Sequence, residues 1–302
     1  MNHFLEVRNV VKRFSNHTAL DDVSINVPEG GIFGLLGRNG AGKTTLIRII
    51  NRITAPDSGR IVFDGHEMTA EDVALIGYLP EERGLYRKMK VGEQATYLAM
   101  LKGLSRREAQ ARLKKWFEKL GILSWWDRKL EELSKGMQQK VQFVITVVHE
   151  PQLLIFDEPF SGFDPVNAEL LKKEMLELRD QGHTIIYSTH NMESVEEVCD
   201  YFAIIDKSHV VLDGNVEEVR RKFREGLYSV SYEGAVVLPE SKMYSVLSSA
   251  TDRGGTKLTV SKKDGVSNSA LASELAGFGE LTCFAEQFPS MNDIFLKTVG
   301  GR

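Results

Sequence analysis

One short stretch near the start of the chain, Gly37–Thr45, limits what the chain can fold into more than any other. It reads Gly-Arg-Asn-Gly-Ala-Gly-Lys-Thr-Thr and fits the pattern of a glycine, four residues, a second glycine, a lysine and a serine or threonine. Small residues let successive backbone N–H groups converge on phosphate oxygens, and a bulky side chain at Gly40 or Gly42 would block that approach. The stretch therefore predicts a phosphate-binding loop.

The flanking residues supply the structural context that this pattern requires. Gly31–Leu36 is short and apolar, as expected of a buried strand, and Thr45–Ile53 is rich in aliphatic residues, as expected of a helix. We expect Lys43 to reach the outer phosphates and Thr44 to hold Mg²⁺, whereas the alternative is a glycine-rich turn that happens to carry a lysine. The predicted phosphate-binding residues are Gly37, Arg38, Asn39, Gly40, Ala41, Gly42, Lys43, Thr44 and Thr45.

Apolar segments of strand length alternate with helical segments through the first 222 residues. This alternation implies a mostly parallel sheet with helices on both faces. Two strand patterns, at residues 3–12 and 18–27, come before the loop. From about residue 85 to 150 the sequence pattern is typical of helices. We therefore expect an α/β fold with a helical insert; the family resemblance described below implies the P-loop NTPase (RecA-like) type, with an N-terminal antiparallel β subdomain.

The composition shifts near residue 223, which predicts a domain boundary between residues 1–222 and 223–302. Strands are expected at roughly 227–233, 256–262 and 280–287, and helices at 267–277 and 289–298. This segment has enough apolar residues for a small α+β domain, and it carries no chemical motif.

Overall composition argues against several classes of protein. The net charge of −4 gives no indication of a surface for nucleic acid. No apolar run approaches the roughly 20 residues needed to span a bilayer. The two cysteines, Cys199 and Cys283, are far apart and show no metal-type spacing, which fits a reducing cytosol. These features predict a cytoplasmic protein.

A second candidate site follows the apolar stretch Gln152–Phe156, which ends in Asp157 and Glu158. Ligands bind at the carboxyl edge of a parallel sheet, so a carboxylate there lies beside the phosphate loop. Asp157 is then placed to hold Mg²⁺, and Glu158 to orient or polarise the attacking water. The alternative is that these are ordinary acidic residues at a strand end. Taken without the phosphate loop, that interpretation is as well supported as the functional one.

At this point the chain resembles the ATP-binding cassette (ABC) ATPases. The segment Leu133–Gln139, which reads Leu-Ser-Lys-Gly-Met-Gln-Gln, matches the signature that distinguishes this family from other phosphate-loop NTPases. The resemblance covers about residues 3–220. It implies that Phe14 stacks on adenine, with a core phenylalanine as the alternative, and that Ser134 and Gly136 face the γ-phosphate bound by a partner chain.

The same resemblance assigns chemical roles around the second site. It implies that Thr44 and Asp157 hold Mg²⁺, that Glu158 is the catalytic carboxylate and that His190 contacts the γ-phosphate, although a lone histidine at a strand end is usually only structural. Ser161–Asp164 matches a loop at the dimer interface. Asp164 is also expected to cap the following helix, and we keep both interpretations.

Two departures from the family pattern affect these expectations. Glu81 stands where the family usually has glutamine; its carboxylate still offers an oxygen to Mg²⁺, but it adds negative charge beside a triphosphate. Lys135 and Met137 replace the usual glycine and glutamine of the signature. Because Ser134 and Gly136 are kept, we expect the signature to be competent.

The resemblance implies an ATPase subunit that binds ATP and Mg²⁺, forms a head-to-tail homodimer or heterodimer with a similar ATPase, and powers a membrane permease at the inner face of the cell membrane. The end of the chain, Pro289–Phe295, resembles the extension of bacterial drug or sodium exporter ATPases. One alternative is a soluble cassette ATPase that acts on ribosomes or DNA. Another is a nucleotide-binding regulator without hydrolysis, which the presence of Glu158 and His190 disfavours.

Overall fold

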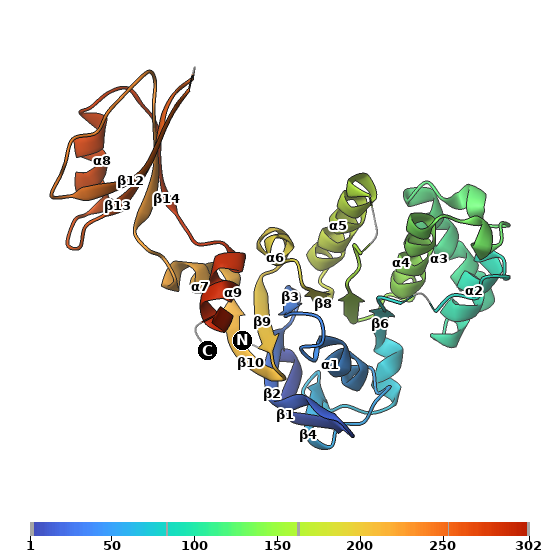
Figure 1. Ribbon diagram of the computed structural model, residues 1–302. Helices are drawn as coiled ribbons and strands as arrows, with labels where there is room; N and C mark the ends of the chain where they lie inside the picture. The colour runs from blue at the N-terminus through green and yellow to red at the C-terminus, as the bar shows by residue number, and fades with distance from the viewer. Residues whose placement is uncertain (1–2, 83, 162–163, 253, 301–302) are drawn as a thin grey trace. The chain divides into compact units, whose positions relative to one another are not determined.

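The computed structural model describes residues 3–82, 84–161, 164–252 and 254–300. These residues form two compact units. The first comprises the chain up to Val216 together with the residues from Thr298 on, and the second comprises Glu217–Lys297. Figure 1 shows the order of the elements along the chain.

A six-stranded, mostly parallel sheet is the centre of the first unit in the described part of the chain. Its order is β10-β9-β3-β8-β7-β6, and only the β10–β9 pair is antiparallel. The strands are β3 (Ile32–Leu36), β6 (Ile76–Leu79), β7 (Leu153–Asp157), β8 (Thr184–Thr189), β9 (Tyr201–Asp206) and β10 (His209–Asn215). Every residue of β3, β7 and β8 is buried, as expected for strands covered on both faces.

Helices cover both faces of this sheet, with α1 on one side and α5 and α6 on the other (Figure 1). Side chains at the N-caps fix where three of the helices begin: Ser134 accepts from Met137 N, Asp164 from Asn167 N, and Asn191 from Glu193 N. The helices are α1 (Lys43–Ile50), α4 (Lys135–Val147), α5 (Pro165–Asp180) and α6 (Met192–Val198).

An N-terminal antiparallel sheet packs against the other side of α1. Its strand order is β2-β1-β4-β5, with β1 (His3–Phe14), β2 (His17–Pro28), β4 (Ser58–Phe63) and β5 (His66–Glu67). Leu46 and Ile50 of α1 share one apolar core with Leu5 of β1 and with Leu35 and Ile155 of the central sheet. The helix that follows the phosphate loop is therefore clamped between two sheets, as the predicted β subdomain requires.

The predicted helical insert lies between β6 and β7. It contains α2 (Val91–Leu101), α3 (Arg106–Lys119) and α4, with short 3-10 turns at Leu123–Trp125 and Leu130–Glu132; another such turn, Glu71–Leu75, precedes β6. Leu113 and Phe117 of α3 are buried, and Phe143 of α4 stacks on Phe156 of β7. The apolar side chains of α3 are thus used for packing, and Phe143 of α4 joins the insert to the central sheet.

The second unit has a separate core. Its four described strands pair in the order β12-β13-β11-β14 and are all antiparallel. Tyr228, Val230 and Leu258 on one face of this sheet pack against Leu271 and Leu275 of α8. The elements after β10 are α7 (Val216–Lys222), β11 (Leu227–Tyr232), β12 (Tyr244–Asp252), β13 (Gly255–Lys262), α8 (Asn268–Ala276), β14 (Leu281–Gln287) and α9 (Met291–Gly300).

Two of these elements, α7 and β12, were not predicted from the sequence. β12 includes the small, polar run Ser248-Ser249-Ala250, which lacks the β-branched and aromatic residues on which a strand prediction depends. It forms a strand because β13 pairs with it along its length. Across the described residues, no helix has both the length and the apolar character needed to cross a bilayer.

Candidate active site

A hollow of about 360 Å³ lies where the phosphate loop meets the carboxyl end of β7. Glycine and lysine come from the loop, two carboxylates come from the end of β7, and a third comes from the segment after β6. The residues lining it are His17, Ala19, Arg38, Asn39, Gly40, Gly42, Lys43, Thr44, Thr45, Glu81, Asp157 and Glu158. The structure thus brings together most of the residues that sequence patterns assigned to phosphate, metal and catalysis.

The phosphate loop is held in shape by two glycines that no other residue can replace without strain. Gly42 has φ +119°, and a Cβ there would lie 2.4 Å from the carbonyl oxygen of Ala19. Gly37 has φ +150°, and a Cβ there would lie 2.2 Å from the carbonyl oxygen of Ile205. Neighbouring strands press on the loop from both sides, so the absence of side chains is a packing requirement as well as a means of exposing backbone N–H groups.

Lys43 is the cation at the centre of this loop. Its Nζ donates to the carbonyl oxygens of Gly37 at 2.6 Å and of Arg38 at 3.3 Å, so the loop wraps around the ammonium group. Burial lowers the pKa of Lys43, while the carboxylates of Glu158 and Asp157 act in the opposite direction. A buried ammonium group so placed is suited to neutralising phosphate charge.

Thr44 and Asp157 present the oxygens expected of a magnesium site. Thr44 Oγ1 donates to Asp157 Oδ2 at 3.2 Å, and the Asp157 side chain is only 1% exposed. Asp157 Oδ1 is buried and has no hydrogen-bond partner among the described residues. Burial raises the pKa of Asp157, because removal from water disfavours the charged carboxylate. One carboxylate and one hydroxyl, completed by substrate phosphates and water, form a donor set that fits Mg²⁺.

Glu158 and His190 form a direct pair next to Asp157. His190 Nδ1 lies 2.6 Å from Glu158 Oε1, and Thr189 Oγ1 donates to Glu158 Oε2 at 3.4 Å. Glu158 has φ +49°, an uncommon value for a residue other than glycine, and its backbone N–H donates to the Ser188 carbonyl oxygen at 3.0 Å. The carboxylate is therefore fixed by neighbours at the end of β8 and points into the pocket.

Phe14, the predicted base platform, is not among the residues that line this pocket, and its role in stacking on adenine stays a prediction. The Phe14 side chain is 45% exposed, and its ring stacks on the ring of His17 with centroids 5.5 Å apart and planes at 26°. On this side the residues that line the pocket are His17 and Ala19. His17 lies three residues after Phe14 across a tight turn, and its place in the pocket wall was not predicted from the sequence.

Ser134 and Gly136 are not among the residues that line this pocket. Ser134 is exposed at the start of α4, where its Oγ accepts from Met137 N at 3.3 Å, and Gly136 is half-buried in the first turn. Glu81 does line the pocket and is exposed. The signature residues are thus on the surface, available to another molecule.

The loop from Ser161 to Asp164 is anchored at both described ends. Gln139 of α4 donates through Nε2 to the Ser161 carbonyl oxygen at 2.7 Å, and Asp164 accepts from Asn167 N at 3.0 Å as the N-cap of α5. Gly162 and Phe163 lie outside the described residues. The cap predicted for Asp164 is present, and its expected role at a dimer interface stays a prediction.

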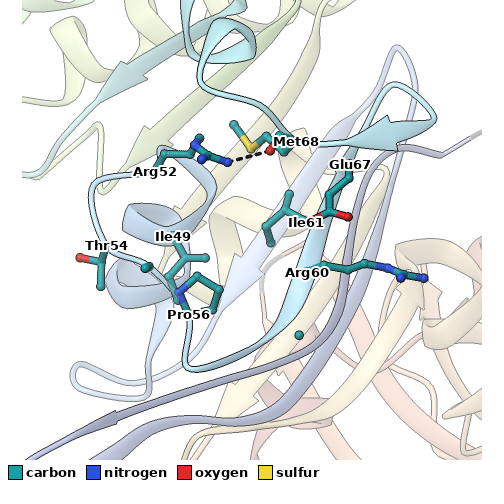
Figure 2. Close-up of a pocket in the computed structure, with 10 residues that line it drawn as sticks. Ile49, Arg52, Thr54, Pro56, Arg60, Ile61, Glu67 and Met68 are labelled. Carbon is teal, nitrogen blue, oxygen red and sulfur yellow. Dashed lines mark hydrogen bonds between the residues drawn. The ribbon is translucent and has the colours of Figure 1, made fainter.

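A second hollow, of about 230 Å³, lies at the opposite end of α1 (Figure 2). Arg52 Nη1 donates to the Met68 carbonyl oxygen at 2.7 Å and closes one side of this hollow. The labelled side chains of Ile49 and Ile61 supply an apolar lining, and Arg60 extends away from it (Figure 2). The Arg52 bond ties the end of α1 to the residues after β5, so both ends of the helix that carries Lys43 and Thr44 are fixed.

A phosphate loop between a parallel strand and a helix, with a metal-type carboxylate at the end of a neighbouring strand, defines a P-loop NTPase. Comparison with known proteins narrows this class. Residues 20–161 match the ABC transporter family, and residues 214–299 match the family described as the ATP-binding protein DrrA1-3-like, C-terminal domain.

Several similar proteins are named as ATP-binding proteins or as ATP-binding subunits of ABC transporters. The "Uncharacterized ABC transporter ATP-binding protein YhaQ" of Bacillus subtilis is 42% identical over 98% of both chains. The "Linearmycin resistance ATP-binding protein LnrL" of the same organism is 34% identical over 70% of this chain and 68% of that protein. A solved "Structure of ATP binding subunit of ABC transporter" superposes with a TM-score of 0.68 at 33% identity, over 73% of this chain and 93% of that one.

The chain belongs to the ATP-binding subunits of ABC transporters. This confirms the resemblance drawn from Leu133–Gln139, the P-loop NTPase fold and the ATPase activity predicted for the chain. Nucleotide binding follows from the family. The alternative of a soluble cassette ATPase that acts on ribosomes or DNA finds no support in these comparisons.

Proposed function

We propose that this chain hydrolyses ATP to power a separate membrane permease that works in export. The observation that carries this proposal is the convergence of Lys43, Asp157 and Glu158 on one pocket beside the phosphate loop, with His190 bound to Glu158. Relatives named for linearmycin resistance and lantibiotic transport support the direction of transport. So does the match of residues 214–299 to the C-terminal domain of DrrA-type proteins.

Asp157 and Glu158 have different proposed roles because their surroundings differ. Asp157 is buried beside Thr44 and, with Thr44 and Glu81, is placed to hold Mg²⁺, which would neutralise charge on the phosphates. Glu158 is half-buried and faces the pocket, so it orients and polarises the attacking water. His190 holds Glu158 in place and contacts the γ-phosphate. Lys43 and the loop N–H groups stabilise the charge on the outer phosphates.

A second cassette completes the site in this proposal. Ser134 and Gly136 are on the surface of the chain and outside its own pocket. In a head-to-tail homodimer, or a heterodimer with a similar ATPase, they would contact the γ-phosphate bound by the partner. ADP lacks that phosphate, so hydrolysis removes the contact and loosens the dimer.

The helical insert offers a surface on which a permease would dock. A hollow of about 220 Å³ is lined by residues of α2, α3 and the turn after α3, including Tyr97, Met100 and Trp126. Tyr97, Met100 and the neighbouring Leu101 are exposed large apolar side chains. We propose that a cytoplasmic helix of the permease occupies this hollow, together with the loop Glu81–Lys90. The chain would then lie on the inner face of the cell membrane.

The test is to purify the ATP-bound chain and to identify the molecules that co-purify with it. The Glu158→Gln variant would be tagged in its native cells, trapped with ATP, extracted from membranes with mild detergent and its bound proteins identified. We expect a polytopic membrane protein to be recovered with the tagged chain. Adding the change Tyr97→Glu should reduce the amount recovered without affecting ATP binding. Recovery of ribosomes or nucleic acid in place of any membrane protein would contradict the proposal.

A further inference from the structure

A serine lies beside Asp157, near the carboxyl end of the neighbouring strand. Parallel pairing of β7 with β8 places Ser188 next to Asp157, and the backbone N–H of Glu158 donates to the Ser188 carbonyl oxygen at 3.0 Å. Asp157 lines the active-site pocket, whereas Ser188 is outside that lining and completely buried. The Ser188 side chain is therefore placed to act on the carboxylate and not directly on a ligand.

The Ser188 hydroxyl lies on an otherwise apolar part of the sheet. Alternate residues of a strand face the same side, so Ser188 shares a side with Ile186, and Asp157 shares one with Ile155. Both isoleucines belong to the apolar core that includes α1, and so does Leu35, the β3 partner of Ser188. Packing alone would favour an apolar side chain at position 188, because burial of a hydroxyl costs free energy unless it is hydrogen-bonded.

Two buried oxygens at this position lack a partner. Neither Ser188 Oγ nor Asp157 Oδ1 has a hydrogen-bond partner among the described residues, whereas Asp157 Oδ2 accepts from Thr44 Oγ1. The side chains of Ser188 and Thr44 both act to lower the pKa of Asp157, against the effect of burial, so both hydroxyls lie close to the carboxylate. A hydroxyl donor and a carboxylate acceptor that are buried on neighbouring strands can satisfy each other.

We propose that Ser188 is a positioning residue for the metal site: its hydroxyl donates to Asp157 and fixes the carboxylate in the orientation that a metal ion on the bound nucleotide requires. The inference rests on the proposed function, because it requires Asp157 to serve Mg²⁺ on a nucleoside triphosphate. Carboxylates that hold a metal ion are themselves held by hydrogen bonds, and loss of such a partner weakens metal binding. Ser188 then contributes to affinity for the metal–nucleotide complex and contributes nothing to affinity for the nucleotide without metal.

The test measures the factor by which Mg²⁺ strengthens ATP binding. Variants would be made in the Glu158→Gln background, so that ATP is not consumed, and titrated by calorimetry with ATP in either Mg²⁺ or EDTA. Ser188→Ala should reduce this factor by roughly tenfold and leave ATP binding in EDTA unchanged. Ser188→Thr, which keeps the hydroxyl, should behave as the parent chain. Thr184→Val is the matched control, because it removes a buried hydroxyl from the other end of β8, where Thr184 Oγ1 accepts from Gly30 N at 3.0 Å.

Urea unfolding in EDTA separates this role from a purely structural one. Because Ser188 Oγ has no hydrogen-bond partner among the described residues, Ser188→Ala should leave the midpoint of unfolding unchanged. Thr184→Val should lower the midpoint, because it leaves the Gly30 N–H without its acceptor. A midpoint lowered as much in Ser188→Ala as in Thr184→Val would show that the hydroxyl serves the fold, and would overturn the inference.

The calorimetric results distinguish failure of the inference from failure of the proposed function. If Mg²⁺ strengthens ATP binding equally in Ser188→Ala and in the parent chain, Ser188 does not position the metal site. The same conclusion follows if Ser188→Ala weakens ATP binding equally in Mg²⁺ and in EDTA. If the parent chain binds ATP no more tightly in Mg²⁺ than in EDTA, or does not bind ATP, the proposed function itself is wrong and the inference is wrong with it.

Discussion

At the scale of single residues, neighbouring groups of the same chemical type have different roles because their surroundings differ. Asp157 and Glu158 are adjacent, yet the first is buried beside Thr44 and the second is paired with His190. A buried carboxylate with a free oxygen is suited to a metal ion, and a half-buried carboxylate that faces the pocket is suited to a water molecule. The backbone turn at Glu158, with φ +49°, separates the two environments.

His149 gives a prediction about stability that belongs to this scale. Its Nε2 lies 3.3 Å from the Ile76 carbonyl oxygen, and its Nδ1 is buried with no hydrogen-bond partner in the described part of the chain. Burial, reinforced by the nearby charges of Lys102 and Arg112, lowers the pKa of His149 to about 4. Unfolded histidine has a pKa of about 6.5. Between these two pH values the unfolded chain binds a proton that the folded chain does not, so stability falls as the pH is lowered.

The measurement is urea unfolding at pH 7 and pH 5. The three tryptophans, Trp116, Trp125 and Trp126, lie in the same unit as His149, so their fluorescence reports its unfolding. His149→Gln should lose about 2 kcal/mol less stability than the parent chain on acidification. His66→Gln is the control of opposite sign, because a hydrogen bond to Asp72 raises the pKa of His66. An equal pH dependence in the parent chain and His149→Gln would show that His149 is not buried as described.

At the scale of elements, one lysine joins the helical insert to the helix α5. Lys119, at the end of α3, binds Glu174 and Glu177 of α5, the latter at 2.6 Å, and its Nζ lies 5.0 Å from the centroid of the Trp116 ring. Glu174 is almost completely buried. Removing the lysine alone leaves that carboxylate without its cation, which costs more than the pair contributes when intact.

Lys119→Met should therefore lower the free energy of unfolding by roughly 2–3 kcal/mol. The double change Lys119→Met with Glu174→Gln should recover part of this loss, because the buried charge is then gone. Lys115→Met, an exposed position on the same helix, is the control and should change stability by less than about 0.5 kcal/mol. Chemical unfolding followed by circular dichroism measures all three. No recovery in the double variant would show that the loss has another cause.

At the scale of the whole molecule, the fold of the first unit could be predicted because local signals and global topology agree. The loop Gly37–Thr45, the buried strands and the N-caps at Ser134 and Asp164 each depend on a few neighbouring residues. By contrast, β12 depends on pairing with β13, and the contact of Lys119 with α5 spans 55 positions in sequence. Such contacts leave no local pattern in the sequence.

The C-terminal unit gives a prediction at this scale. Its core comprises its own residues, and the residues lining the active-site pocket all lie in the other unit. A chain ended after Lys222 should therefore bind ATP within about twofold of the full chain, a difference of roughly 0.4 kcal/mol. We expect it to form the ATP-bound dimer less readily, as measured by sedimentation of the Glu158→Gln variant. Unchanged ATPase, dimerisation and transport in the shortened chain would mean that the unit has no role in the cycle.

The central claim is that Glu158 activates water in a site completed by a second cassette. The measurement that tests it most directly is ATP hydrolysis and ATP-dependent dimerisation of the parent chain, of Glu158→Gln and of the exposed control Glu29→Gln. We expect Glu158→Gln to lose hydrolysis by about 10²–10³-fold and to persist as an ATP-bound dimer, while Glu29→Gln behaves as the parent chain. Hydrolysis by Glu158→Gln at the parent rate would contradict the account.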